Sequence, residues 1–533
     1  MIEGAGGVEV PKALFYAIIL FCTHRSTAAL KRPACFAGAG WKSASGGELP
    51  KCVPIYNRRN TCRSGIRSQV PAGRKRIQTM NRDKNSQLQY QKMTGTPVYR
   101  LILQLSVPSI ISMLITNIYN LVDTAFVGQL GNSASGAVGI VFGFMSIIQA
   151  FAFMFGQGAG SAISRALGGR DTERASVYAS SGFAGSFVCG AVITCIGFAV
   201  LDPMVMALGS TETIAPFART YITYILIAAP FMSSSLTMNN ILRYEGRAAL
   251  GMIGLMTGAI LNMIGDPIFM FGMGMGIAGA GLSTALSQII SFGILLSMFL
   301  TGRSQSRLSL KRAASGFGVY LDIMATGFPS LLRQGLNSIT TVLLNTHAAV
   351  YGDAAVAAMS IVSRIVFFVF SIAIGIGQGF QPVSGFNYGA GRYSRLRKGY
   401  RFTMLLAEGI LAAAVVLVFL KSGSLIGIFR DDPEVIRIGT RALRLQCAAL
   451  FLLPPCMVTE MLFQSTGRRL QASVLSALRS GIFFIPSLLI LDRFRGLAGI
   501  QEAQPLAYVL GFFPAMYLAA DFFRKLPRQD RAD

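Results

Sequence analysis

Charged side chains are scarce in this sequence of 533 residues. Asp, Glu, Lys and Arg together make up 13% of the chain, whereas an average soluble domain contains about 25%. Hydrophobic residues make up 52% of it, and the mean hydropathy is +0.53. This composition excludes an ordinary soluble protein and predicts a polytopic integral membrane protein with the lipid bilayer as its surroundings.

Histidine is almost absent, and motifs for metal, redox or nucleotide chemistry are missing. The chain has 2 histidines, and its 8 cysteines show neither the spacing of a zinc site nor a CxxC pair. The phosphate-binding string G-x-x-x-x-G-K-[ST] does not occur. We therefore expect neither an enzyme nor an ATP-driven pump, and we predict no catalytic residue, resident metal or cofactor.

The net charge of +25 comes from short loops and from the N-terminal region, not from the apolar segments. Basic loops such as "GGRDTER" and "GRSQSRLSLKR" alternate with loops that have no Lys or Arg, such as "GQLGNSAS" and "FGMGMG". By the positive-inside rule, this alternation places both termini and the middle loop, residues 302–315, in the cytoplasm. We expect a multi-pass protein of the plasma (inner) membrane, with no nucleic-acid partner.

The first 92 residues do not match the rest of the chain. They combine Arg and Lys with Gly, Ser and Pro, and they contain the only tryptophan, Trp41. Their apolar stretch, residues 13–22, is too short to cross a bilayer, which takes about 20 residues. Since such a composition cannot bury a core, we predict that residues 1–92 are a disordered tail, or an upstream extension of a shorter protein that starts at Met80 or Met93.

From residue 97 onward, twelve apolar segments are long enough to span the membrane, and they form two copies. Pro108 and Pro329 lie 221 residues apart, and the same offset relates Gly131 to Gly352. Each copy has six segments, an even number, so both copies have the same orientation. The sequence therefore predicts an all-α protein of two six-helix lobes, related by a pseudo-two-fold axis along the membrane normal, a plan typical of carriers. The predicted parts are an N-lobe (97–301), a C-lobe (316–523) and a cytoplasmic tail (524–533).

Two acidic residues lie inside the apolar segments of the first copy. Asp123 is the only formally charged residue in its segment, and Asp266 follows Asn262 by four residues, which places the amide on the same helix face. Pro267 removes a backbone donor beside Asp266. An ionised Asp near the bilayer centre costs about 2.5–3.5 kcal/mol on insertion scales, so we expect the two acids to share a cation or a proton.

Three long strings resemble one known family. They are "NLVDTAFVG" in the first segment, "NMIGDPIFMFGMGMGIAGAGLSTALSQ" across segments five and six, and "GIGQGFQPVSGFNYGAGR" across the eighth segment and its loop. In this order, on a duplicated frame, they make residues 97–525 similar to the multidrug and toxic compound extrusion (MATE) transporters. The resemblance implies an antiporter that exports amphipathic, often cationic drugs or metabolites in exchange for protons or sodium ions, by rocking of the two lobes. We expect it to act as a monomer.

In that family, the cation site of the N-lobe uses an Asp of the first helix, an Asn-x-x-x-Asp pair, a Thr and a further Asn. The resemblance therefore implies that the matching residues of this chain hold the coupling ion, H⁺ or Na⁺. We add Tyr119, which lies one turn before Asp123. This set consists of Asp123, Asp266, Asn262, Asn239, Thr284 and Tyr119. The alternative for the amides and the hydroxyl is ordinary hydrogen bonding between helices, which contributes about 0.6 kcal/mol per bond.

The second copy departs from this pattern. Leu344 stands at the repeat position of Asp123, and the seventh segment, centred near residue 334, has no acid, so the sequence leaves a C-lobe ion site undecided. Glu460 in the tenth segment is interpreted either as a contact for cationic substrates or as a structural acid with a partner. A substrate path between the lobes is predicted along segments one, two, seven, eight and ten. Its candidate residues are Gly143, Ser363, Gln157, Gln378 and Glu460.

Other functions are compatible with a duplicated bundle. A flippase of lipid-linked oligosaccharides has a related plan, but it would need a strongly basic cavity for a pyrophosphate, whereas Asp123 and Asp266 favour cations. Another carrier, such as a sugar or peptide uniporter, is not excluded by the fold alone. The sequence by itself does not decide between proton and sodium.

Overall fold

The computed structural model describes residues 86–314 and 316–531. Most of the predicted tail, residues 1–85, lies outside the described residues. Residues 86–95 form a helix, in which Met93 is buried and the Gln89 side chain donates hydrogen bonds to the carbonyls of Glu245 and Gly246. This helix includes the last residues of the tail, residues 1–92, that we predicted from composition.

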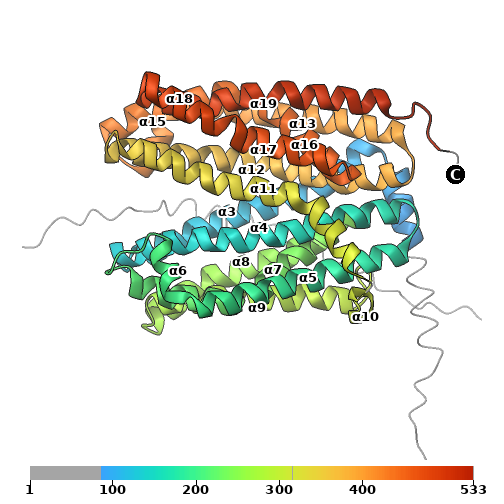
Figure 1. The fold of residues 1–533 in the computed structure, drawn as a ribbon, viewed down its shortest axis with the longest axis horizontal. Helices are drawn as coiled ribbons and strands as arrows, with labels where there is room; N and C mark the ends of the chain where they lie inside the picture. Colours follow the sequence, from blue (N-terminus) through green and yellow to red (C-terminus); the bar gives the residue numbers. More distant parts are fainter. Residues whose placement is uncertain (1–85, 315, 532–533) are drawn as a thin grey trace, which may run out of the picture. The chain divides into compact units, whose positions relative to one another are not determined.

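The described residues are helical and form two groups, coloured blue to green and yellow to red in Figure 1. The N-lobe contains α3 (Val98–Gly128), α4 (Asn132–Gly168), α5 (Thr172–Ala199), α6 (Leu201–Ala207), α7 (Ala215–Tyr244), α8 (Ala248–Pro267), the π-helical turn η1 (Ile268–Gly272) and α9 (Ile277–Leu300). The C-lobe contains α11 (Phe317–Ala349), α12 (Asp353–Gly389), α13 (Tyr393–Leu420), α14 (Ser422–Phe429), α15 (Pro433–Leu450), α16 (Leu453–Thr466), α17 (Arg469–Ala477), η2 (Leu478–Ile482), α18 (Phe484–Arg495) and α19 (Leu497–Lys525).

Ten helices in the described part are long and apolar enough to cross a membrane, and α15 and α16, bent by 53°, can supply an eleventh span. The remaining long helix is α11, whose 33 residues include Asp322 and Arg333. With α11 counted, each lobe has six spans. The prediction of an all-α membrane protein in two lobes is confirmed, and the twelve-span count is consistent with it.

The repeat is visible in the backbone as well as in the sequence. Gly131 and Gly352 precede α4 and α12, and their φ angles are 110° and 97°. Gly246 and Gly467 follow α7 and α16, with φ angles of 77° and 81°. Residues with a Cβ rarely adopt a positive φ, so glycine at these four positions lets the equivalent helices begin or end in the same way in both lobes.

The two lobes touch through glycines in one half of the bundle. A Cβ on Gly158 of α4 would lie 2.1 Å from the Ile323 carbonyl oxygen of α11. A Cβ on Gly379 of α12, the repeat equivalent of Gly158, would lie 2.5 Å from the Ser106 nitrogen of α3. These contacts lie toward the end of the bundle that carries the basic loops, which we call the basic end. The lobes are therefore in backbone contact near the basic end, along what we call the seam.

In the other half of the bundle, each lobe has a hydrophobic cluster of its own. Buried residues from both lobes, such as Phe155 and Phe380, share one hydrophobic cluster near the basic end. Toward the opposite end, the N-lobe and the C-lobe have separate clusters. Ile147 and Phe368 lie eleven residues, about three turns, before Gly158 and Gly379 on the same helix faces, yet they are 47% and 45% exposed. The lobes are closed at the basic end and separate toward the opposite end.

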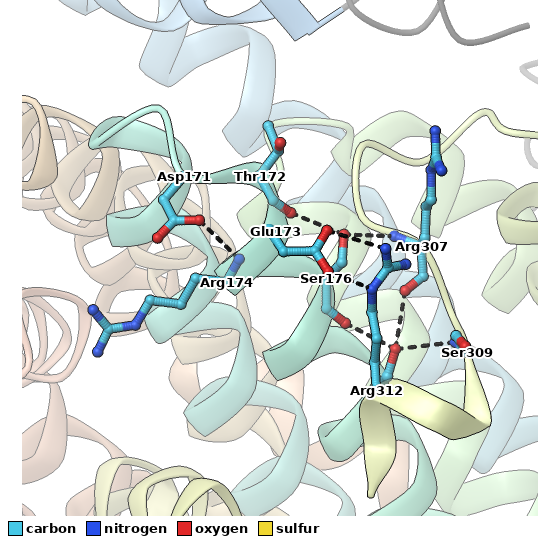
Figure 2. Close-up of polar contacts among 9 residues, drawn as sticks. Asp171, Thr172, Glu173, Arg174, Ser176, Arg307, Ser309 and Arg312 are labelled. Atoms are coloured by element: carbon cyan, nitrogen blue, oxygen red, sulfur yellow. Dashed lines mark hydrogen bonds and ion pairs between the residues drawn. The ribbon is translucent and has the colours of Figure 1, made fainter. Parts of the chain in front are cut away.

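The linker between the lobes, residues 302–315, is bound to the N-lobe. The buried Glu245 carboxylate accepts hydrogen bonds from the Ser304 hydroxyl and from the backbone nitrogens of residues 305 and 306, at 2.8–2.9 Å. Figure 2 shows the next part of the linker against the start of α5, where Ser176 accepts from the Arg307 nitrogen and Arg312 pairs with Glu173. Most of the linker contacts are therefore with the N-lobe, and its end accepts a hydrogen bond from Tyr320 of α11 at Ala313.

Candidate functional site

The acids of the N-lobe lie at the ends of two helices that pack together toward the end opposite the basic loops. Asp123 is in the last turns of α3, and Asp266 is the last residue of α8 before Pro267. Helix α8 continues as the wider turn η1, an irregularity that often marks functional sites. Asp266 is fully buried, and Asn262 and Thr284 are nearly so. Helices α8 and α9 therefore bury three members of the predicted set, and Asp123 of α3 is half-buried beside them.

The amide of Asn262 connects three of these groups. Its Nδ2 lies 3.1 Å from Asp266 Oδ1, 3.1 Å from Thr284 Oγ1 and 3.4 Å from Ser283 Oγ. The Ser283 hydroxyl in turn donates to the Asn262 carbonyl oxygen at 3.2 Å. An amide that donates to Asp266 holds that carboxyl as an acceptor and leaves the Asn262 oxygen turned away from it.

Three buried oxygens of this cluster have no hydrogen-bond partner among the described residues. They are Asp123 Oδ1, Asp266 Oδ2 and Asn262 Oδ1. The two carboxyl groups are within hydrogen-bonding reach of one another. Two ionised carboxylates at this separation repel strongly in a medium of low dielectric constant. The arrangement therefore requires a proton on one acid, or a cation held between oxygen ligands.

Two tyrosines complete the cluster, and the sequence analysis identified only one of them. Tyr119 lies one turn before Asp123 on α3, and both acids act on its hydroxyl. Tyr221 of α7 is 2% exposed and lies near Thr284 and both acids. The sequence position of Tyr221 could have identified it, because it lies near the start of the fourth span, at the same end of the bundle as the acids.

Asn239 is the one member of the predicted set that the structure does not bring into the cluster. Its Nδ2 would lie 2.7 Å from a Cβ on Gly251, in the first turn of α8. Gly251 and Asp266 are fifteen residues apart on that helix, which corresponds to about 22 Å. In this conformation Asn239 lies toward the basic end, away from the two acids.

A family model, MatE, matches residues 108–268 and 329–489. The two matched segments begin and end at the offset of the internal repeat. The chain belongs to the MatE family. It is therefore a MATE transporter, as the resemblance of the three strings predicted.

Relatives of this MATE transporter cover almost all of its two lobes. Multidrug export protein MepA of Staphylococcus saprophyticus is 26% identical over 436 residues, which are 82% of this chain and 96% of MepA. The Staphylococcus aureus protein of the same name is also 26% identical over the same shares. A crystal structure of MATE in complex with MaL6 superposes with a TM-score of 0.78 at 26% identity and covers 83% of this chain and 99% of that one. The outward-facing conformation of a multidrug resistance MATE family transporter superposes with a TM-score of 0.78 at 26% identity, and the match covers 82% of this chain and 98% of that one.

In the C-lobe of this MATE transporter, the repeat positions of Asp123 and Asp266 are Leu344 and Ser487, and neither is an acid. Leu344 is buried in the C-lobe hydrophobic cluster. Glu460 is 1% exposed, and its Oε1 lies 2.8 Å from Arg333 Nη1, while its Oε2 lies 3.9 Å from Arg479 Nη2. Of the two interpretations of Glu460, the geometry favours the structural acid with a partner. His347 is also paired, with Asp492 at 2.6 Å.

The other predicted path residues divide between the two halves of the bundle. A Cβ on Gly143 would meet nothing within 4 Å, and Ser363 is half-buried. Gln157 and Gln378 are buried, and Gln157 Oε1 accepts a hydrogen bond from Ser330 of the other lobe at 2.8 Å. Gly143 is thus open to an approaching molecule, whereas Gln157 belongs to the closed seam.

Proposed function

We propose that this MATE transporter exports small amphipathic organic compounds in exchange for protons or sodium ions. The observation that carries the proposal is the pair Asp123–Asp266, buried with unpartnered oxygens and within reach of one another. Its relatives named multidrug export proteins support the substrate class. The cluster holds the coupling ion, and the space between the separated halves of the lobes holds the compound. The unit of transport is a monomer.

The coupling follows from the charge of the cluster. When a proton or Na⁺ is bound, α3 and α8 can lie together; when it leaves, the two carboxylates repel and the end of α3 shifts. Because α3 also forms the seam with α12 through Ser106 and Gly379, a shift of α3 changes the relative stability of the two lobe arrangements. A carrier needs such a difference in binding between its two states.

The basic end faces the cytoplasm in this proposal, with both termini and the linker on that side of the plasma membrane. The positive-inside rule supports this orientation. The arrangement described above is then the state open to the outside, because the seam closes the basic end. Reporter fusions after residue 312 and after residue 525 should both read cytoplasmic, and an outside reading at the linker would contradict the six-plus-six topology.

The proposal is tested in proteoliposomes that contain the full chain and a cationic rhodamine methyl ester. The proton gradient and the sodium gradient are imposed independently, and dye uptake and ion flux are followed together. We expect dye movement that depends on one of the two gradients and is accompanied by counterflow of that ion. Dye movement that depends on neither gradient would indicate a uniporter. Movement of a lipid-linked oligosaccharide without dye transport would favour the flippase.

A further inference from the structure

Around Glu460, inside the C-lobe, positive charges outnumber negative ones. The single carboxylate of Glu460 faces the guanidinium groups of Arg333 on α11 and Arg479 on η2. Arg479 also lies over the ring of Phe370, 5.7 Å from its centroid. The exposed fractions of the two arginine side chains are 12% and 8%. One acid therefore balances two buried cations, and one positive charge is left over.

A further guanidinium approaches this group from the N-lobe. Arg243 of α7 is 4% exposed, donates to Asn240 through Nη2, and lies over the ring of Tyr244. Its Nε has no hydrogen-bond partner among the described residues. Asn240, to which Arg243 donates, lies against Gly156 of α4, since a Cβ on Gly156 would be 2.9 Å from its Nδ2. The next residue, Gln157, accepts from Ser330, one turn before Arg333 on α11. Arg243 and Arg333 thus approach the same lobe contact from opposite lobes.

The hydroxyl of Tyr244 lies in the same place and is also without a partner in the described part of the chain. The charged groups that act on it are Arg243, Arg333 and Arg165. The Tyr244 ring packs directly against Gly160 of α4: a Cβ on that glycine would lie only 2.2 Å from Tyr244 Cδ2. The ring therefore cannot be displaced easily. One donor N–H and one O–H are therefore fixed beside an excess of positive charge.

This position is next to the seam. Arg333 lies one turn beyond Ser330, whose hydroxyl donates to Gln157 across the lobes. In the present state the closed seam buries Arg243. When the lobes separate at the basic end, both guanidinium groups come to line the entrance from that side. Arg243 would then be buried in one state of each transport cycle and exposed in the other. Burying an unpaired charge is costly, so a negatively charged group should accompany Arg243 when it is buried.

We propose that Arg243 and Arg333 bind an anionic oxygen group, a carboxylate, of the transported compound as it is loaded from the basic end. The inference rests on the proposed export function and narrows its substrate class. The planar guanidinium fork matches a carboxylate with two parallel hydrogen bonds, and such a group would give Arg243 Nε its missing acceptor. Since the N-lobe acids hold the coupling cation, the compounds that fit best are zwitterionic or anionic amphiphiles.

The test uses two rhodamine dyes that differ by one group: the free acid, a zwitterion with an ionised carboxylate, and its methyl ester, a plain cation. Binding to the full chain in detergent is measured by fluorescence polarisation, in a Tris chloride buffer of low ionic strength that contains no carboxylate, with and without sulfate. We expect the free acid to bind about tenfold more tightly than the ester, as one charge-assisted pair allows. Arg243→Gln should remove this preference and leave the affinity for the ester unchanged.

Two further variants make the result specific. Arg243→Lys keeps the charge without the fork and should retain part of the preference. Arg219→Gln alters an exposed arginine of the same helix, paired with Asp202 at 2.9 Å, and should change neither affinity. Equal binding of the two dyes, or an equal loss for both in Arg243→Gln, would overturn the proposal.

Free inorganic anions offer the same chemistry as a carboxylate. If sulfate binds in an Arg243-dependent way while the free acid is not preferred, the site holds an inorganic anion only, and the substrate assignment is wrong. Gradient-driven export of the methyl ester is measured in parallel. If that export persists while the preference is missing, only the anion site fails; if neither dye is exported, the export function itself fails.

Discussion

The two lobes share one helical frame but differ in the charge of their interiors. The N-lobe holds two acids in contact with amide and hydroxyl groups, whereas the C-lobe holds Glu460 between two arginines. At equivalent positions, Asp123 corresponds to Leu344, and Asn239 corresponds to Glu460. The shared residues include glycines at turns and lobe contacts, such as Gly131 and Gly158, where the backbone permits little else. The ionisable residues are under no such backbone constraint, so the same frame can hold a cation in one lobe and a different charge in the other.

The largest effect is expected from a substitution at Asp123, the acid that the C-lobe replaces with Leu344. Asp123→Asn keeps the size and hydrogen bonding of the side chain but removes the charge, so we expect gradient-driven export to be abolished while folding is preserved. The measurement is dye export from proteoliposomes under an imposed gradient, with size-exclusion chromatography as the check on folding. Leu344→Asn, the same residue at the equivalent position of the other lobe, is the matched control and should retain export. Native export by Asp123→Asn would make this acid a structural residue.

The C-lobe charges are tested by Glu460→Gln. Without the carboxylate, Arg333 and Arg479 would face one another unpaired, and breaking a buried pair in this way typically costs about 3–5 kcal/mol of the free energy of unfolding. Asn239→Ala, at the repeat equivalent, should cost only about 0.6 kcal/mol, the value of one hydrogen bond between membrane helices. Both are measured by denaturant unfolding in detergent. Similar losses for the two variants would contradict the assignment of Glu460 as the acid that compensates the C-lobe arginines.

The two halves of one helix provide the next test. A Cβ on Gly327 of α11 would lie 1.8 Å from the Met154 carbonyl oxygen, whereas a Cβ on Gly335, eight residues later, would meet nothing within 4 Å. We expect Gly327→Ala to weaken the closed state by about 1–3 kcal/mol through overpacking. Labelling of a cysteine at the buried Ser161 by a maleimide should then become faster. Gly335→Ala is the control, and equal labelling in both variants would show that the seam does not close the basic end.

The smallest effect is expected at the linker, whose first residues, 304–306, are bound to the N-lobe through Glu245. Glu245→Gln removes the charge that accepts four hydrogen bonds from residues 304–306, so trypsin should cleave at Arg307 faster than in the unchanged protein. Arg312→Gln removes a partly exposed ion pair with Glu173, a type of pair that contributes about 0–1 kcal/mol, and should change the cleavage rate much less. If Glu245→Gln leaves the rate unaltered, the linker is held by other contacts.

The sequence alone determined the membrane class and the duplication, and it predicted most of the acid cluster. Asp123, Asp266, Asn262 and Thr284 were grouped before any contact was known, because they match the cation-site positions of the family that the three strings resemble. The spacing within "NMIGDP" fixed the Asn262–Asp266 contact outright, because four residues make about one turn.

Only the tertiary structure decided which helix each face meets. Depth along α7 separates Tyr221, which joins the acids, from Asn239, which does not, and this separation depends on how α7 packs against α8 and α9. The pairing of Glu460 with arginines from α11 and η2, and the approach of Arg243 from the other lobe, join residues far apart in the chain. The closure of the basic end is likewise a relation between two rigid lobes. The angle between the lobes is set by backbone contacts at glycines such as Gly158 and Gly379. These contacts join distant segments, so the order of residues along the chain does not predict the angle.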